Sequence, residues 1–238
     1  MGEERYLRSI SWKIQGRILI DVGAHHGSYC NYLSKLSPQS TIYAFEPHPK
    51  SIQILKSRLI SPRIRVINKA VGEIAEPVEL YDFADSDGST QASMSKEAVQ
   101  FFEPIVVAHS VDCTTLDDFI TAEGLDEIAL LKVDAEGFDL AVLRGAKRTL
   151  AQKRIETIQF EFIPGNVITR TMMRDFFEVL EGYEIFRICL NGQLMALSPY
   201  DAKRCEIFVQ QNLIAIRVDS DVAEHANWGA RSSVRKSG

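Results

Sequence analysis

The chain has 238 residues, of which 45% are hydrophobic and 25% charged, with a formal net charge of −5. This length fits one α/β domain, and the composition is that of an ordinary globular protein. An acidic chain is poorly suited to nucleic acid or anionic membranes, so we expect no nucleic-acid partner. The N-terminus lacks a signal-peptide pattern, and no apolar run reaches the roughly 20 residues of a membrane span. A cytoplasmic location is therefore expected.

The first third of the chain alternates short apolar runs with amphipathic stretches. Strands are predicted at residues 17–22, 41–45 and 64–67, with helices at residues 29–36 and 51–59 between them. Repeated strand–helix units predict a mostly parallel sheet that is covered by helices.

The middle of the chain interrupts this pattern and then resumes it. An extra strand is expected at residues 78–83, followed by a polar loop at residues 84–93. Further on, the predicted elements are a strand at 128–134, a helix at 138–150 and a strand at 155–162. A long polar loop inside a compact domain is either disordered or functional, and residues 85–93 are a candidate lid or acceptor wall, together with residues 96–103.

The C-terminal third is predicted to complete the sheet with antiparallel strands. Residues 183–190 and 193–197 flank Asn191-Gly192, a typical hairpin turn, and residues 207–216 form a last apolar stretch. The domain organisation expected is a lead-in at residues 1–16, one domain at residues 17–218 and a frayed, polar tail at residues 219–238.

The loop after the first predicted strand is the first candidate cofactor site. It runs from Asp21 to Gly27 and has neither the glycine pattern of dinucleotide sites nor that of phosphate-binding loops. Its leading carboxylate would repel a pyrophosphate, but it is compatible with the sulfonium and ammonium groups of S-adenosyl-L-methionine (SAM). Gly23 and Gly27 would let the backbone pass close to a ligand, with Ala24 beside them.

Glu46 ends the second predicted strand, where an acidic residue commonly binds ribose hydroxyls in nucleotide-binding α/β folds. Either Asp21 or Glu46 alone could be an ordinary solvated strand end or a helix cap. Both together, flanking a glycine turn, favour a site for SAM over one for NAD. Pro47 and Ala70 are expected on the wall of the same site.

Three further segments follow in order: VDCTTLDDFI at residues 111–120, LKVDAEGFD at 131–139 and VLRGA at 142–146. Together with Asp21-Val22-Gly23-Ala24 and Phe45-Glu46-Pro47, they resemble the FkbM family of SAM-dependent methyltransferases. The resemblance extends from about Ile18 to Phe162, and the segment Leu131–Gly137 is its most specific part.

This resemblance implies a Rossmann-like class I methyltransferase domain. Its mostly parallel seven-stranded sheet would carry helices on both faces and an antiparallel C-terminal hairpin. It also implies SAM as the cofactor and O-methylation as the reaction. One position departs from the family pattern, because His25 stands where an Asn usually follows the Gly-Ala pair. We assign His25 to the cofactor wall, where its charge at pH about 6 to 7 would weaken the binding of a cation.

Three carboxylates are the candidate catalytic groups. Asp134 ends the fourth strand of the predicted core and is also expected at the cofactor, Glu136 is expected to begin the next helix, and Glu161 ends the fifth strand. One of them would act as general base, with a pKa raised by its like-charged neighbours. Alternatively, Asp134 and Glu161 would hold a divalent cation such as Mg²⁺. A purely structural alternative makes Asp134 or Glu136 a helix cap.

The sequence leaves three functions open. The leading one is O-methylation of a hydroxyl on a small molecule or glycan: a sugar, a glycolipid or a secondary metabolite. The His25 departure keeps open a catalytically inactive SAM-binding protein of the same fold. An NAD-dependent oxidoreductase is disfavoured by the missing glycine pattern. His109, just before the segment at residues 111–120, is either an acceptor-facing residue or an ordinary polar residue.

Overall fold

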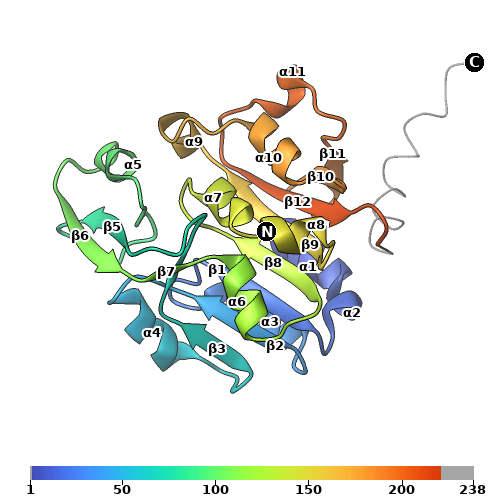
Figure 1. Ribbon diagram of the computed structural model, residues 1–238, viewed down its shortest axis with the longest axis horizontal. Coiled ribbons are helices and arrows are strands. Elements are labelled where there is room, and N and C mark those ends of the chain that lie inside the picture. Colours follow the sequence, from blue (N-terminus) through green and yellow to red (C-terminus); the bar gives the residue numbers. More distant parts are fainter. Residues whose placement is uncertain (1, 221–238) are drawn as a thin grey trace, which may run out of the picture.

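A single large sheet organises the protein, whose computed structural model describes residues 2–220. The sheet has eight strands in the order β11-β10-β12-β9-β8-β1-β2-β3 (Figure 1). The strands β3, β2, β1, β8 and β9 are mutually parallel, and β12 is antiparallel to both β9 and β10. In chain order they are β1 (Ile18–Val22), β2 (Thr41–Phe45), β3 (Ile64–Ile67), β8 (Ile128–Val133), β9 (Ile155–Phe162), β10 (Tyr183–Ile188), β11 (Leu194–Ala196) and β12 (Gln211–Arg217).

Helices cover both faces of this sheet because side chains along each strand alternate between two cores. On β1, Leu19 lies in one hydrophobic cluster and Ile20 in the other. The Leu19 cluster includes side chains from the helices α1 (Gly2–Ser9), α2 (Ser11–Ile14), α3 (Ser28–Leu36) and α4 (Ser51–Arg58). The Ile20 cluster includes side chains from α6 (Leu116–Ala122), α7 (Asp139–Arg144), α8 (Lys147–Ala151), α10 (Met173–Val179) and α11 (Ala202–Cys205).

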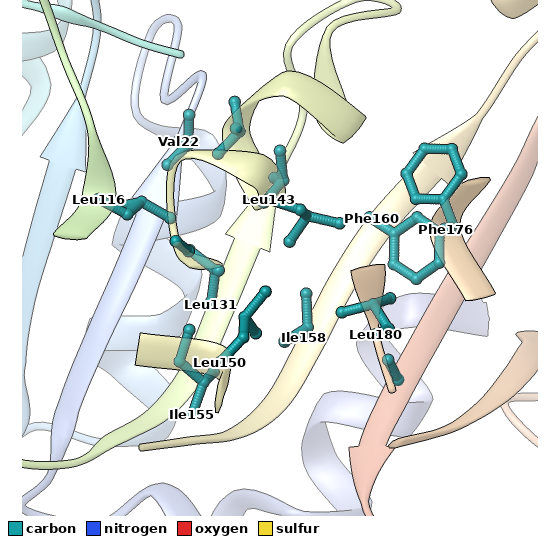
Figure 2. Packing of buried hydrophobic residues seen from close by; sticks show 14 of the residues in the cluster. Val22, Leu116, Leu131, Leu143, Leu150, Ile155, Ile158, Phe160, Phe176 and Leu180 are labelled. Carbon is teal, nitrogen blue, oxygen red and sulfur yellow. The ribbon is translucent and has the colours of Figure 1, made fainter. Parts of the chain in front are cut away.

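The Ile20 cluster is the larger of the two cores. Figure 2 shows Leu131 and Ile158 of the sheet facing Leu143 and Leu150 of the covering helices. At one end of this core the ring of Phe160 on β9 stacks on that of Phe176 on α10, with 4.8 Å between ring centroids. This packing holds α10 against β9.

A smaller unit projects from one edge of the molecule (Figure 1). It consists of β5 (Val78–Phe83), paired antiparallel with β6 (Val106–Val111), and the helix α5 (Lys96–Gln100). A second short pair, β4 (Ala70–Val71) with β7 (Cys113–Thr114), connects this unit to the large sheet. The extra strand expected at residues 78–83 is therefore confirmed, and β6 is its partner.

The predicted fold class is confirmed, with two corrections. The large sheet has eight strands and not seven, because β11, the second strand of the Asn191-Gly192 hairpin, stays paired with β10. The single helix predicted at residues 138–150 is wrong, since α7 and α8 are separate. A Cβ on Gly145 would lie 2.0 Å from the Gly72 carbonyl oxygen, and the Gly145 carbonyl accepts a hydrogen bond from Asp117 N at 2.9 Å. This close packing against other segments interrupts the helix.

The expected lead-in at residues 1–16 contains α1 and α2, whose buried Tyr6, Leu7 and Ile14 pack in the Leu19 cluster. Most of the expected tail, residues 221–238, lies outside the described residues. Within residues 2–220, every helix is too short or too polar to cross a membrane.

Candidate active site

A cavity of about 430 Å³ opens where β1, β2, β8 and β9 end. This is the edge at which parallel α/β sheets bind ligands. One part of its wall is apolar: Val22, Ala24, Phe45, Pro47, Ala70, Val71, Leu80 and Met94. The other part carries a concentration of charge: Glu3, Glu46, Lys69, Lys132, Asp134, Glu136 and Glu161.

Gly23 makes the tight turn at the start of this cavity. Its φ of 82° lies in the left-handed region, and its N–H donates to the Phe45 carbonyl at 3.1 Å. A Cβ at Gly23 would lie 1.9 Å from the Asp134 carbonyl oxygen. Only glycine therefore lets the ends of β1 and β8 come this close together.

Asp21 lies directly beneath the turn and is fully buried. Neither of its carboxylate oxygens has a hydrogen-bond partner, and Lys132 Nζ is 3.9 Å away. Burial raises the pKa of Asp21 to about 6, against the lowering effect of Lys132. A buried carboxylate without a hydrogen bond is costly, and the nearby positive charge of Lys132 offsets part of this cost.

Glu46 connects the loop after β1 to the segment after β2. One of its oxygens accepts from His25 N at 2.7 Å and the other from His48 N at 2.8 Å. The residue is 5% exposed, and burial raises its pKa to about 7 despite these two hydrogen bonds. Each carboxylate oxygen keeps a lone pair for a further donor, such as a ribose hydroxyl.

The backbone of His25 explains the unusual residue in the first loop. Its φ of 46° is left-handed, a conformation that Asn and His tolerate better than most residues. The ring of His25 stacks on that of His26, with 3.6 Å between centroids. Its Nε2 lies 3.2 Å from the carbonyl oxygen of Gly88. His25 thus contacts the polar loop at residues 84–93.

A buried lysine organises the charged part of the wall. Lys132 Nζ donates to Asp134 Oδ2 at 2.8 Å and lies 5.0 Å from the centre of the Tyr29 ring. Burial lowers the pKa of Lys132, but the charges of Asp134 and Asp21 outweigh it, so the net shift is upward. This lysine therefore stays charged at neutral pH.

The other two predicted catalytic carboxyls also line the cavity. Burial raises the pKa of Glu136 to about 8, with the charges of Asp134 and Glu161 adding to the effect. Burial and then Asp134 raise the pKa of Glu161 in the same direction. Glu136 does not begin a helix, because it has a φ of 46° in the turn before α7, which is capped at Phe138 without a side-chain bond.

Several residues on this wall or directly behind it were not predicted from the sequence. Tyr29 Oη donates to Gln159 Oε1 at 2.7 Å, and Gln159 Nε2 donates to Glu3 on α1. The Asn212 amide, turned to satisfy its neighbours, donates to Glu3 at 3.2 Å and to Glu161 at 3.0 Å. Lys132 gave a signal that could have been used, because it is a lone cation within an apolar strand. Glu3 gave none.

Two predicted cofactor residues lie off the cavity wall. Asp21 is beneath it, and Gly27 precedes α3, where a Cβ would lie 2.6 Å from Leu55 Cδ1. Gly27 therefore permits close packing of α3 against α4.

Among residues 2–220, the group of at least three potential metal ligands that comes together is His48, Asp87 and His109, which includes neither Asp134 nor Glu161.

Comparison with known proteins agrees with this geometry. The Methyltransferase FkbM domain matches residues 21–185, more than two thirds of the chain. The chain belongs to the FkbM methyltransferase family. The match covers the Gly23 turn, Glu46 and all three rim carboxylates, Asp134, Glu136 and Glu161.

Curated relatives of this FkbM domain protein carry methyltransferase names. The 2-O-methyltransferase NoeI of Sinorhizobium fredii is 25% identical over 151 residues, covering 58% of this chain and 60% of that protein. Methyltransferase sdnD of Sordaria araneosa is 26% identical over 154 residues, covering 53% of this chain and 59% of that protein. The chain thus spans less than two thirds of the length of the curated relatives it matches.

Among solved structures, the chain is similar to the O-methyltransferase TomG from Streptomyces achromogenes in complex with SAM. The match covers 90% of this chain and 79% of the TomG chain. Its TM-score is 0.47 and its sequence identity 11%.

Proposed function

We propose that this protein is a SAM-dependent methyltransferase that transfers a methyl group to a hydroxyl of a small-molecule or glycan acceptor. The observation that carries the proposal is a cavity whose wall carries Glu46 together with the carboxylates of Asp134, Glu136 and Glu161. Such a cavity suits a cationic nucleoside and an acceptor whose proton must be removed. Family membership and the names of the curated relatives support the same reaction class.

The residues present fit SAM. Glu46 has free lone pairs where ribose hydroxyls would donate, as acidic residues at this position do in related folds. Val71 and Leu80 offer an apolar surface to an adenine ring. Asp21, buried and without a hydrogen-bond partner, adds negative potential below the site for the positively charged part of the cofactor.

SAM supplies an electrophilic methyl on a sulfonium, so an acceptor needs only alignment and loss of its proton. Glu136 is the base that the geometry favours. Among residues 2–220, no donor bonds its side-chain carboxylate, and its raised pKa places it near the operating pH of a general base. The Lys132–Asp134 pair and Glu161 would orient the acceptor hydroxyl beside it.

The rim also bears on the proposal of a divalent cation at Asp134 and Glu161. Lys132 Nζ lies 2.8 Å from Asp134 Oδ2 and already places a positive charge there. We therefore propose that the lysine takes the electrostatic role, and we expect turnover to persist after dialysis against a chelator.

The two alternatives differ in what they bind and turn over. An inactive SAM-binding protein would bind the cofactor without transferring its methyl group. An NAD-dependent oxidoreductase is disfavoured because the acidic wall would repel a pyrophosphate.

Calorimetric titration with SAM, with S-adenosylhomocysteine and with NAD tests the cofactor. We expect micromolar dissociation constants of about 1 to 100 µM for the two sulfur nucleotides and no heat with NAD. Absence of binding in folded, cofactor-free protein would remove the proposal. A screen of sugars, glycolipids and phenolic or polyketide alcohols with radiolabelled SAM then tests transfer, with RNA as the acceptor expected to remain unlabelled.

A further inference from the structure

A single carboxylate outside the cavity wall connects three parts of the molecule. Asp87 lies in the polar loop that follows β5, and its side chain is 11% exposed. Its Oδ1 lies 2.8 Å from His48 Nε2 and 2.7 Å from His109 Nε2, and its Oδ2 lies 2.7 Å from Lys50 Nζ. His48 and Lys50 come from the segment between β2 and α4, and His109 from β6. His109 therefore faces Asp87, and it is not among the residues that line the cavity.

The proton of His48 can be assigned from its surroundings. The Nδ1 atom lies 3.2 Å from Lys50 N and 3.4 Å from Ser51 N, and both of these backbone N–H groups point toward it as donors. A neutral ring that accepts at Nδ1 carries its hydrogen on Nε2. The buried His48 therefore accepts from the start of α4 and donates to Asp87.

This proton assignment argues against a metal ion among the same three side chains. Their ligand atoms lie within 4.8 Å of one another, but a metal would need a bare Nε2 on His48. The hydrogen would then move to Nδ1, where it would face the two N–H donors. The contacts of 2.7 and 2.8 Å are also hydrogen-bond distances. Burial opposes the charge of Asp87, yet the Lys50, His109 and His48 hydrogen bonds bring its pKa down to about 2.

The loop that carries Asp87 covers the proposed cofactor site. Ser89, Thr90, Ala92 and Ser93 line the cavity, and Ser93 Oγ donates to the carbonyl of Glu136 at 2.9 Å. The adjacent turn is shaped by Asp82, which accepts from Gly88 N at 2.7 Å and Ser89 N at 2.8 Å. Asp82 Oδ2 also lies 3.4 Å from His48 Nε2, but Asp87 makes the shorter contact with His48 and alone of the two also binds Lys50 and His109.

We propose that Asp87 is a positioning residue that holds the loop at residues 84–93 against the cofactor site through His48, His109 and Lys50. The inference rests on the proposed function for its ligand, SAM. The segment between β2 and α4 binds Asp87 through His48 and Lys50, and it binds Glu46 through the N–H of His48. Asp87 therefore connects the loop to Glu46 through this segment. Without it, the loop loses three charge-assisted hydrogen bonds, and the cofactor site loses a pre-formed wall.

The test compares Asp87→Ala and Asp87→Asn with Asp85→Ala, an exposed aspartate in the same loop. Hydrogen exchange of the loop amides is measured first without any ligand. We expect exchange about tenfold faster in Asp87→Ala, a smaller increase in Asp87→Asn and no change in Asp85→Ala. Circular dichroism checks that each variant is folded. Equal exchange in Asp87→Ala and Asp85→Ala would overturn the proposal.

Titration with SAM is the second readout. We expect Asp87→Ala to weaken SAM binding about tenfold, with a raised KM for SAM and a kcat at saturation within about twofold of wild type. Unchanged SAM affinity in a variant whose loop exchanges faster would overturn the role in cofactor binding. If the wild type itself binds no SAM, the proposed function fails, while loop exchange still decides whether Asp87 holds the loop.

Titration with Zn²⁺ and Co²⁺ separates the hydrogen-bonded cluster from a metal site. Under our proposal the wild type binds neither ion tightly. One equivalent of Co²⁺ bound by wild type with a ligand-field spectrum, and lost in Asp87→Ala, would make these side chains a metal centre and contradict the proposal.

Discussion

Lys132 shows how one buried residue sets the charge of the whole rim. An ammonium group inside an apolar strand costs free energy unless it is paired. Here it is paired with Asp134 at 2.8 Å, with Asp21 at 3.9 Å and with the face of Tyr29. Lys132 binds the carboxylate of Asp134. In the described part of the chain no donor binds the carboxylate of Glu136, so that carboxylate can accept a proton. The division of roles between two neighbouring carboxylates thus follows from the position of one lysine.

The first prediction at the residue scale concerns Glu136. A base must be ionised, and burial raises the pKa of Glu136 to about 8. We therefore expect kcat/KM for the acceptor to rise with pH and to level off above pH about 8. Glu136→Gln should lower kcat by about 10² to 10⁴-fold and leave SAM affinity within about twofold. The measurement is a pH–rate profile of wild type and variant. An unchanged profile in folded Glu136→Gln would assign the base to another group.

At the scale of elements, the helix α1 brings a distant part of the sequence to the site. Its buried Tyr6 and Leu7 hold it against the sheet. Glu3 at its start then reaches Gln159 on β9, more than 150 residues away in sequence. The helix therefore adds a carboxylate to the cavity wall, where Asn212 donates to both Glu3 and Glu161.

This arrangement predicts a selective effect for Glu3→Gln. Because Glu3 lines the rim and accepts from Gln159, its replacement should raise the KM for the acceptor about three- to tenfold. The dissociation constant of SAM should stay within about twofold, since Glu46 and the first loop are untouched. Steady-state kinetics with each substrate varied in turn separates the two effects. A change confined to SAM would mean that α1 covers the cofactor instead.

At the scale of the whole molecule, the site concentrates carboxyl groups whose pKa values are raised. The values are about 6 for Asp21, about 7 for Glu46 and for Asp139, and about 8 for Glu136. In each case burial is the largest cause. The folded state holds these protons more tightly than the unfolded chain. Ionising the buried carboxyl groups at neutral or higher pH therefore lowers the free energy of unfolding.

The sign of this effect gives a prediction for thermal unfolding. An acid with a raised pKa in the folded state stabilises it below the unfolded pKa, and this contribution is lost as pH rises through the folded value. We expect the Tm of the unliganded protein to fall between pH about 6 and pH about 8.5, with a shallower fall in Glu46→Gln. Saturating SAM should raise Tm more at the higher pH, because a cation binds ionised carboxylates better. Differential scanning fluorimetry measures both, and a Tm that rises over this range would contradict the prediction.

The sequence by itself determined the strand–helix alternation, the Gly23 loop, Glu46 and the three rim carboxylates. These are local signals: hydrophobic periodicity marks the strands, and polar residues at strand ends mark the edge where ligands bind. It also predicted the Asn191-Gly192 hairpin, because that turn needs specific residues.

Only the tertiary structure decided which distant residues meet. Glu3 reaches the rim through the packing of α1, Asp87 meets His48 and His109 through the pairing of β5 with β6, and Gly145 interrupts a helix because Gly72 lies against it. Such contacts depend on the summed packing of many side chains far apart in the chain. Local periodicity carries no information about them, and the pKa values that follow from their burial are therefore properties of the folded protein.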